Sequence, residues 1–271
     1  MHQCPSLGAL AAVTVVGVAT STAQVTLLSQ QRVITATATA DDTTQTASAV
    51  DFEPFARVIT AATTFQTPEG TTVPNEGQTG IDCLVDPNAI RASGFLGGAG
   101  GMSVTGTPVF GEAEALIDVT FRVTEPTPYR IFSTPKPSDY FRDEFEIELE
   151  NTVTGQRLFR IDETQPAQTV DVTGTLQPGT YLIHYEVEFT STGPQSVRNF
   201  NYRFMLGNVC GWIDFNNDGD DGTDADIEAF FACLAGSCCQ NCYGNDFDGD
   251  GDAGTDADIE AFFRILAGGN C

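Results

Sequence analysis

The chain has 271 residues, and its 37 acidic side chains against 12 lysines and arginines give a formal net charge of −25. This balance excludes a nucleic-acid-binding protein that works by neutralising phosphates, and it argues against docking on anionic membranes. Hydrophobic residues make up 41% of the chain, so a packed core is possible, and the frequent Phe, Tyr, Thr and Val residues favour β-strands. Eight cysteines in so acidic a chain fit an oxidising compartment better than the cytosol.

The N-terminal segment, residues 1–23, has the pattern of a secretory signal peptide. An apolar run from Leu7 to Ala19 is followed by small residues that suit cleavage before Gln24. The segment begins without Lys or Arg, so a buried N-terminal helix or strand remains the alternative. No later run approaches the roughly 20 apolar residues that span a bilayer. We therefore expect a secreted protein, extracellular or associated with the cell surface, without a transmembrane segment.

Residues 24–208 have the pattern of short β-strands. Apolar residues alternate with polar ones in four rows: Ala115, Ile117, Val119, Phe121 and Val123; Phe145, Ile147 and Leu149; Tyr181, Ile183, Tyr185, Val187 and Phe189; Phe200, Tyr202 and Phe204. A period of two predicts half-buried antiparallel strands. No strong helical period intervenes, so we predict a mainly β fold, an antiparallel β-sandwich of the jelly-roll or immunoglobulin-like kind. Residues 41–50 and 67–78 are predicted to be loop-rich, and the glycine-rich 97–101 to form a turn.

The end of the chain is a tandem repeat. Residues 210–239 align with residues 242–271 without gaps, and 20 of the 30 positions are identical. Such similarity indicates a duplicated supersecondary unit. Residues 210–271 carry 14 acidic residues and one basic residue, so about half of the net charge lies in less than a quarter of the chain.

Each repeat opens with the oxygen-ligand pattern of an EF-hand calcium loop. Acidic or amide side chains occupy alternate positions, and a glycine at the sixth position allows the sharp turn of the loop. Oxygen ligands without His or Cys favour Ca²⁺ over zinc or copper. We therefore expect two Ca²⁺ ions. The candidate ligands are Asp214, Asn216, Asp218 and Asp220 in the first repeat and Asp246, Asp248, Asp250 and Asp252 in the second.

Each loop then leads into a predicted helix, which makes the C-terminal part a small α-helical unit. Thr223 and Thr255 are candidate N-caps, with Asp226 and Asp258 three residues later in a variant of the capping box. Apolar residues follow at helical spacing: Ile227, Phe230, Phe231 and Leu234 in the first repeat and Ile259, Phe262, Phe263 and Leu266 in the second. In each repeat a glycine two residues after that leucine is expected to end the helix.

With these features residues 210–271 resemble the dockerin family, in which two repeats of a Ca²⁺ loop and a helix lie at the end of a secreted chain. The GDAGTDADIEAFF core of the second repeat is similar to the cysteine-bracketed, GC-type dockerins. The resemblance implies a cohesin-type protein partner. The loops depart from the usual pattern, because position 12 holds alanine in both repeats. Asp226 and Asp258, one residue later, are then the expected closing ligands, with Asp224 and Asp256 as competing candidates.

Six cysteines in this segment are more than is usual in a dockerin, and their positions follow the repeat. We expect disulfides within each repeat: Cys210–Cys239, Cys242–Cys271 and Cys233–Cys238. Many other connectivities are possible, so pairing across the repeats remains open, and the dense cysteines at 238–242 leave a zinc site as the rival. Cys83 is the odd thiol of the predicted sandwich, either buried or paired, since Cys4 would leave with the signal peptide.

The sequence offers no recognisable catalytic constellation. His184 lies on a predicted strand face beside Glu186 and Glu188, without a Gly-x-Ser-x-Gly motif or metal-ligand spacing, and is expected to be a solvated or packed strand residue. A glycosidase carboxylate remains the alternative for a row of acidic residues that we expect on the wet side of a sheet: Glu144, Glu146, Glu148 and Glu150.

We therefore expect a secreted, non-catalytic β-sandwich protein (residues 24–208) that a calcium-binding dockerin (residues 210–271) anchors to a cohesin-type partner or a cell-surface complex. The alternatives are a carbohydrate-binding module or a glycan-active enzyme delivered by the same dockerin, with a polysaccharide as ligand or substrate. The single tryptophan, Trp212, lies at the edge of the repeat. This position disfavours an aromatic sugar-binding platform in the sandwich.

Overall fold

The computed structural model describes the chain from residue 24 to residue 269, with gaps. The described residues are 24–133, 145–162, 164, 170–207, 210–216, 218, 220–239, 242, 244–248, 250 and 252–269. The predicted signal peptide, residues 1–23, lies outside them, as do Glu144 and Cys271.

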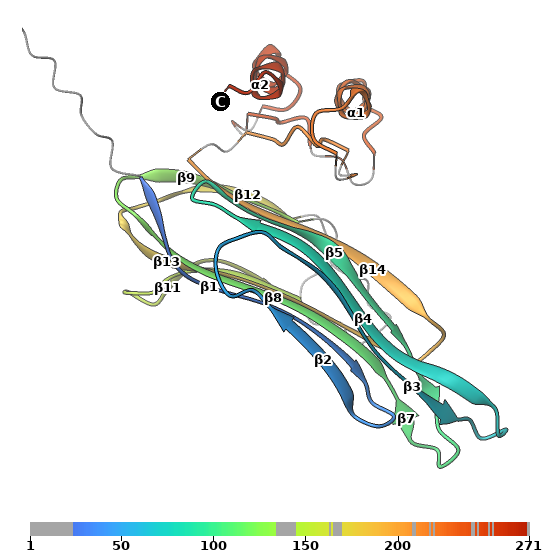
Figure 1. Ribbon diagram of the computed structural model, residues 1–271. Helices are drawn as coiled ribbons and strands as arrows, with labels where there is room; N and C mark the ends of the chain where they lie inside the picture. Colours follow the sequence, from blue (N-terminus) through green and yellow to red (C-terminus); the bar gives the residue numbers. More distant parts are fainter. Residues whose placement is uncertain are drawn as a thin grey trace, which may run out of the picture.

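Two six-stranded antiparallel sheets form the larger part of the molecule (Figure 1). Sheet A contains, in spatial order, β11 (Gln156–Asp162), β10 (Phe145–Asn151), β13 (Gly179–Ser191), β8 (Gly111–Val123), β1 (Val25–Ala38) and β2 (Thr43–Ser48). Sheet B contains β12 (Val170–Leu176), β9 (Thr127–Ser133), β14 (Ser196–Leu206), β5 (Ala89–Ala99), β4 (Thr72–Val85) and β3 (Phe55–Gln66). A short ribbon pairs β6 (Gly101–Met102) with β7 (Pro108–Val109). The predicted antiparallel β-sandwich is confirmed.

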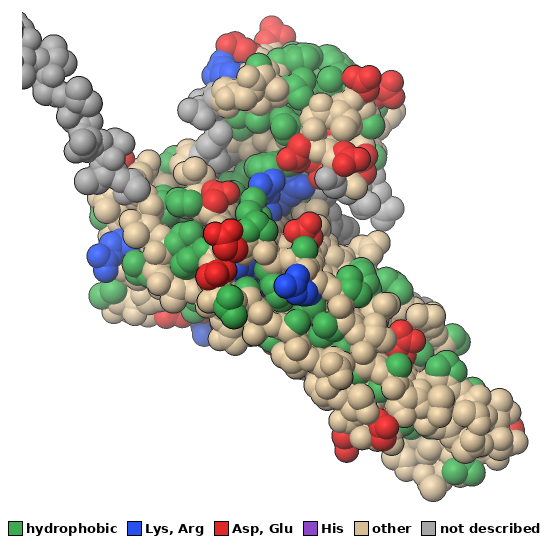
Figure 2. Space-filling model, in the orientation of Figure 1, with side chains coloured by type: hydrophobic (Ala, Val, Ile, Leu, Met, Phe, Trp, Pro, Cys, Tyr) green, Lys and Arg blue, Asp and Glu red, His purple; other side chains and the backbone are tan. Residues whose placement is uncertain are grey.

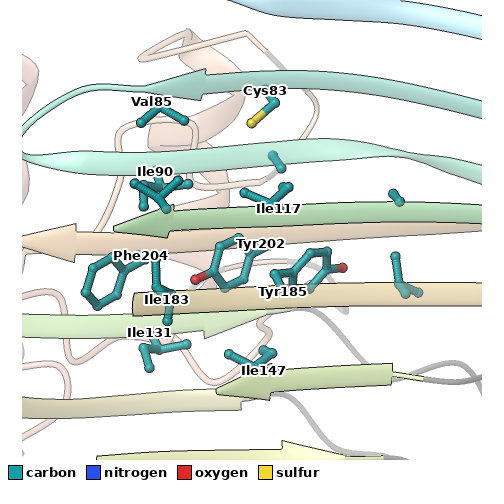
Figure 3. Close-up of a cluster of buried hydrophobic side chains, with 14 of the residues drawn as sticks. Cys83, Val85, Ile90, Ile117, Ile131, Ile147, Ile183, Tyr185, Tyr202 and Phe204 are labelled. Atoms are coloured by element: carbon teal, nitrogen blue, oxygen red, sulfur yellow. The ribbon is translucent and has the colours of Figure 1, made fainter. Parts of the chain in front are cut away.

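The core lies between the two sheets and contains all four predicted apolar rows. Successive side chains of a strand point to opposite faces, so each row turns one face of its strand inward. The centre of the core is aromatic: Tyr185 of sheet A and Tyr202 of sheet B stack with ring centroids 4.4 Å apart (Figure 3). Neither hydroxyl has a hydrogen-bond partner among the described residues, and burial raises the pKa of both side chains.

Cys83 lies in the same core, on β4. It is the free cysteine of the described part of the chain, and its side chain is fully buried. Burial raises the pKa of its thiol to about 11, against the opposing effect of the nearby Arg32 guanidinium. A thiol that stays protonated in an apolar core is unreactive, so Cys83 acts as a small packing residue.

The sandwich is thin near the β6–β7 ribbon, where small residues replace large ones. A Cβ atom on Gly77 or Gly98 of sheet B would clash with backbone atoms of sheet A. Alanines fill the space beside them: Ala36, Ala38 and Ala61 are all buried. The glycines therefore let the two sheets approach each other backbone to backbone.

This close approach corrects the predicted turn at residues 97–101. Residues 97–99 belong to β5 and pair with β14 and β4. The predicted loop-rich segments 41–50 and 67–78 are also wrong in part. The first contains β2, and the second contains the first half of β4. In the second segment Gly77 meets the backbone of sheet A, and Asn75 donates to the main-chain oxygens of Ala99 and Phe110.

The C-terminal unit, described over residues 210–269, contains two helices. They are α1 (Asp224–Leu234) and α2 (Asp256–Leu266). Thr223 and Thr255 are the N-caps, and the side chains of Asp226 and Asp258 complete capping boxes, as predicted. The glycine after each C-cap has a φ of +85° or +79°, a left-handed conformation that ends the helix. Neither of these helices has the length and hydropathy needed to cross a membrane.

The two helices share one aromatic core. Phe230 of α1 and Phe262 of α2 stack with ring centroids 4.1 Å apart. Phe215 and Phe247, from the loops that precede the helices, pack edge-on against these rings. Phe132 of β9 belongs to the same buried cluster. The C-terminal unit therefore packs directly on the outer face of sheet B, with its loops toward the sandwich and its helices away from it (Figure 1).

Candidate metal centre

The loop before α1 gathers three carboxylates. Oxygen atoms of Asp214, Asp218 and Asp226 all lie within 4.8 Å of one another. The loop turns back on itself through its own hydrogen bonds: Asp214 Oδ1 accepts from the amide of Asp218, and Asp218 Oδ1 accepts from the amide of Asp220, each at 3.0 Å. The bond from the Asp220 amide, with one from the Asn216 side chain, lowers the pKa of Asp218. Three carboxylates at this separation form a donor set suited to a hard divalent cation.

The loop before α2 gathers a second set. Oxygen atoms of Asp246, Asp248 and Asp250 lie within the same 4.8 Å limit. Asp248 Oδ1 accepts from the amide of Asp250, and Asp250 Oδ1 accepts from the amide of Asp252. Burial raises the pKa of Asp248, and the neighbouring carboxylates add to this effect. The set therefore contains mutual repulsion that a bound cation would relieve.

Asp226 and Asp258 connect each loop to its helix. Asp258 Oδ1 accepts from the amides of Phe247 and Asp248, while Oδ2 accepts from the amide and hydroxyl of Thr255. Burial opposes ionisation of Asp258, but these hydrogen bonds outweigh it and lower the pKa of the carboxyl. Asp226 accepts the matching bonds from the Asn216 amide and from the amide and hydroxyl of Thr223. It also belongs to the first carboxylate set, whereas Asp258 lies outside the second set.

The remaining predicted ligands lie in or beside the loops. Asn216 hydrogen-bonds Asp218 through both its amide oxygen and its amide nitrogen. Four other candidates are exposed and lie outside both carboxylate sets: Asp220, Asp252, Asp224 and Asp256. Asp224 and Asp256 are the first residues of their helices. Between the competing closing ligands of the first loop, this arrangement favours Asp226.

The cysteine pairing differs from the prediction in two of three bridges. Cys233–Cys238 is confirmed, but Cys239 pairs with Cys242. The predicted Cys210–Cys239 and Cys242–Cys271 bridges are therefore wrong, although Cys210 is also disulfide-bonded. The prediction assumed that each repeat closes on itself, whereas the repeats share one core and the connection between them carries its own cystine. Because the thiols at 238, 239 and 242 are oxidised, they do not form the alternative zinc site.

An arginine of the sandwich reaches each loop, a feature that the sequence analysis missed. Arg203 of β14 donates to Asp214 Oδ2 at 3.2 Å, and the two side chains are only 7% and 5% exposed. Arg130 of β9 forms a bidentate pair with Asp171 at 2.8 Å and also donates to the main-chain carbonyl of Asp246 at 3.3 Å. The alternation of apolar and polar residues along a strand predicts which side chains face outward. No local pattern in the sequence indicates that the C-terminal unit covers this outer face of sheet B.

Trp212 lies between these elements. The Arg91 guanidinium lies 4.1 Å from the centroid of the Trp212 ring and that of Arg203 lies 5.1 Å from it. The indole nitrogen donates to Asp221 at 2.6 Å, and Arg91 is 3.8 Å from the same carboxylate. A cavity of about 350 Å³ opens beside these residues. Figure 2 shows arginine side chains in the hollow between the C-terminal unit and the sandwich. The residues that line this cavity include Arg91, Arg203, Trp212, Asp214 and Asp221.

Two of the remaining acidic candidates, Glu146 and Glu148, lie on the outer face of sheet A and are paired. Asp118 accepts from His184 Nδ1 at 2.7 Å, and this hydrogen bond raises the pKa of the imidazole against the effect of burial. Arg160 pairs with Glu146 at 2.7 Å and Arg157 with Glu148 at 2.9 Å. The expected wet face therefore carries cross-strand ion pairs.

A scan against models of known protein families finds no match to this chain, and a search of curated proteins finds no relative.

Proposed function

We propose that this is a secreted, non-catalytic β-sandwich protein whose C-terminal unit binds two Ca²⁺ ions and anchors it to a cohesin-type protein partner or a cell-surface complex. The observation that carries the proposal is the pair of carboxylate sets, one in each repeat, each followed by a capped helix. The dockerin-like sequence of the same residues supplies the identity of the partner.

Calcium would act structurally at these loops. Asp214, Asp218 and Asp226 would hold one ion, and the second carboxylate set would hold the other. Bound Ca²⁺ supplies positive charge that offsets the repulsion among the carboxylates. Each loop leads directly into its helix, and Asp226 and Asp258 bond both elements. A loop held by an ion would therefore also fix the first turn of its helix.

The helices offer a surface for a protein partner. Phe231 of α1 and Phe263 of α2 occupy matching positions in the two repeats, and their rings are 6.1 Å apart. Both side chains remain more than 40% exposed, although they are large and apolar. The helices lie on the side of the C-terminal unit away from the sandwich (Figure 1). An exposed apolar pair on an accessible face supports binding of a protein.

The disulfides support secretion. Cys233–Cys238 and Cys239–Cys242 both lie in the C-terminal unit. Disulfides persist in oxidising compartments and are rare in the cytosol. They fit the predicted signal peptide, and they cross-link a unit whose apolar core is small.

Calcium binding is tested with the full chain after treatment with a chelator. Isothermal titration with Ca²⁺ is expected to show two ions bound per chain, and the double variant D218N/D250N to lose most of this binding. The matched control D224N/D256N removes the same charge from the two helix starts and is expected to keep both ions. Absence of binding by the unmodified chain, or equal loss in both double variants, would contradict the proposal.

The partner is tested by capture from an extract of the cell envelope. The immobilised full chain is expected to retain a protein in Ca²⁺ and to release it on addition of chelator. The variant F231S/F263S is expected to lose the capture, whereas E228Q, an exposed change on the same helix α1, keeps it. Capture that is indifferent to both the chelator and F231S/F263S would contradict the proposed anchoring role.

A carbohydrate-binding module is the alternative with less support. Trp212 was the aromatic residue to consider as a sugar platform, but two guanidinium groups lie over its ring. A glycan array probed with the full chain separates the two proposals. Binding to a glycan that chelation leaves unchanged would favour the alternative.

A further inference from the structure

The two repeats differ at two of the positions that meet the sandwich. Trp212 and Asp221 of the first repeat correspond to Gly244 and Ala253 of the second. Trp212 contacts Arg91 and Arg203, and Asp221 lies within ion-pair distance of Arg91. Thus two of the ten substitutions that separate the repeats provide part of the contact between the first repeat and sheet B.

The first loop is also bound to the sandwich through one of its own candidate ligands. Arg203 lies against Asp214 Oδ2, and both side chains are nearly excluded from solvent. The sandwich reaches the corresponding residue of the second repeat, Asp246, through its main-chain carbonyl. The Arg203 guanidinium therefore lies against the carboxylate of Asp214, whereas the Arg130 guanidinium lies against the main-chain carbonyl of Asp246. The positive charge is thus placed differently relative to the ligand oxygens in the two loops.

We propose that Arg203 adds to the difference between the two ion loops, which already have Asn216 in the first loop against Asp248 in the second, so that Ca²⁺ binding in the first loop is coupled to the packing of the C-terminal unit on the sandwich. The inference rests on the proposed calcium function. Asp214 then has two positive neighbours, the Arg203 guanidinium and the bound cation. The two compete for the same carboxylate and repel each other in a site of low solvent exposure. Calcium binding in the first loop is therefore weaker than in the second loop and loosens the Arg203 contact.

The coupling is reciprocal. Calcium that weakens the contact between Arg203 and Asp214 must itself bind less tightly when that contact is strong. Trp212 reports the state of this contact, because it is the only tryptophan in the chain and Arg203 lies over its ring. Its fluorescence emission is therefore expected to change when the first loop fills and not when the second loop fills.

The test uses the full chain in two backgrounds, each with one loop disabled. D250N leaves the first loop to be measured, and D218N leaves the second. In the D250N background R203M is expected to tighten Ca²⁺ binding by about tenfold or more, because it removes a positive charge beside a shared ligand. In the D218N background R203M is expected to change Ca²⁺ binding by less than about twofold. Titration calorimetry gives the constants, and Trp212 emission is recorded in parallel.

Two further variants complete the test, one as a control and one as a replacement for R203M. R264A removes an arginine from α2 and installs the residue that α1 has at the matching position, Ala232. It is expected to leave both constants within about twofold, because Arg264 is exposed and pairs with Glu260. R203Q removes the charge but keeps a hydrogen-bond donor, so it replaces R203M if that variant does not fold.

Equal constants for the two loops, or an equal effect of R203M in both backgrounds, would overturn the inference while leaving the calcium function intact. A Trp212 emission that follows filling of the second loop would also overturn it. If the unmodified chain binds no Ca²⁺, the proposed function fails, and this inference fails with it.

Discussion

Phe132→Ala should detach the C-terminal unit from the sandwich without unfolding the sandwich. The Phe132 side chain is 2% exposed, and the other buried members of its cluster all belong to the C-terminal unit. Truncating a phenylalanine in such a site costs about 3–5 kcal/mol, from lost burial and the cavity that remains. Most of this loss falls on the packing between the two parts. At 1.4 kcal/mol per factor of ten, this loss lowers the equilibrium constant for docking of the C-terminal unit on the sandwich by about 100- to 4000-fold.

The assay combines thermal unfolding with the emission of Trp212. F132A is expected to split the unfolding trace, with the C-terminal unit melting first and Trp212 becoming exposed to quencher. The control F145A truncates a residue of similar burial in the sandwich core, 3% exposed, and is expected to lower the melting of the sandwich instead. A loss of less than about 1 kcal/mol in F132A, with unchanged quenching of Trp212, would refute the reasoning.

Three other predictions concern the core, the outer face of sheet A and the ion loops. Tyr202→Phe is expected to raise the free energy of unfolding by about 1–3 kcal/mol, because it removes a buried hydroxyl that has no partner among the described residues. Denaturant unfolding measures this free energy, and a lower value for the variant would contradict the prediction. The raised pKa of His184 means that its bond to Asp118 stabilises the fold fully below pH 6.5 and loses this effect as the pH rises through the raised pKa. Melting curves between pH 5.5 and 8.5 should therefore lose part of their pH dependence in H184Q, and an unchanged profile would contradict the assignment. Chelation is expected to melt the helices of residues 210–271, and added Ca²⁺ is expected to restore them. A helical circular dichroism signal that does not change on addition of chelator would count against the proposed ion sites.

The strand rows and the helices were predictable because each depends on a local rule. Alternation with a period of two placed Ile117 and Ile183 in the core, where both are 1% exposed. The helix ends followed from Thr223 and Thr255 as caps and from the glycines beyond the helices. Local patterns of this kind are strong because the residue type and the backbone geometry agree.

The thin end of the sandwich was not predictable in the same way. Glycine-rich segments such as 97–101 usually mark turns, because glycine adopts conformations that other residues avoid. Here Gly98 serves instead to let two backbones meet across the sandwich. That role depends on Gly111 and its neighbours in the opposite sheet, which no local pattern identifies.

The carboxylates that the structure gathers in the two loops could be predicted from the sequence, but the relation of the loops to the sandwich could not. The carboxylates of Asp214, Asp218 and Asp226 recur at spacings that a loop around a cation requires, so they could be named in advance. Arg203 and Phe132 have no such signal. They follow the alternation of ordinary outward-facing strand residues, and their burial becomes visible only when the C-terminal unit is placed on sheet B.

Native mass spectrometry of the ion-free full chain with added Ca²⁺ tests the proposed calcium function most directly. The proposal predicts a shift by the mass of two Ca²⁺ ions, one for each carboxylate set, and retention of the second ion when D218N disables the first loop. A chain that takes up no Ca²⁺ in millimolar calcium, or one whose uptake survives the D218N/D250N change, would contradict it.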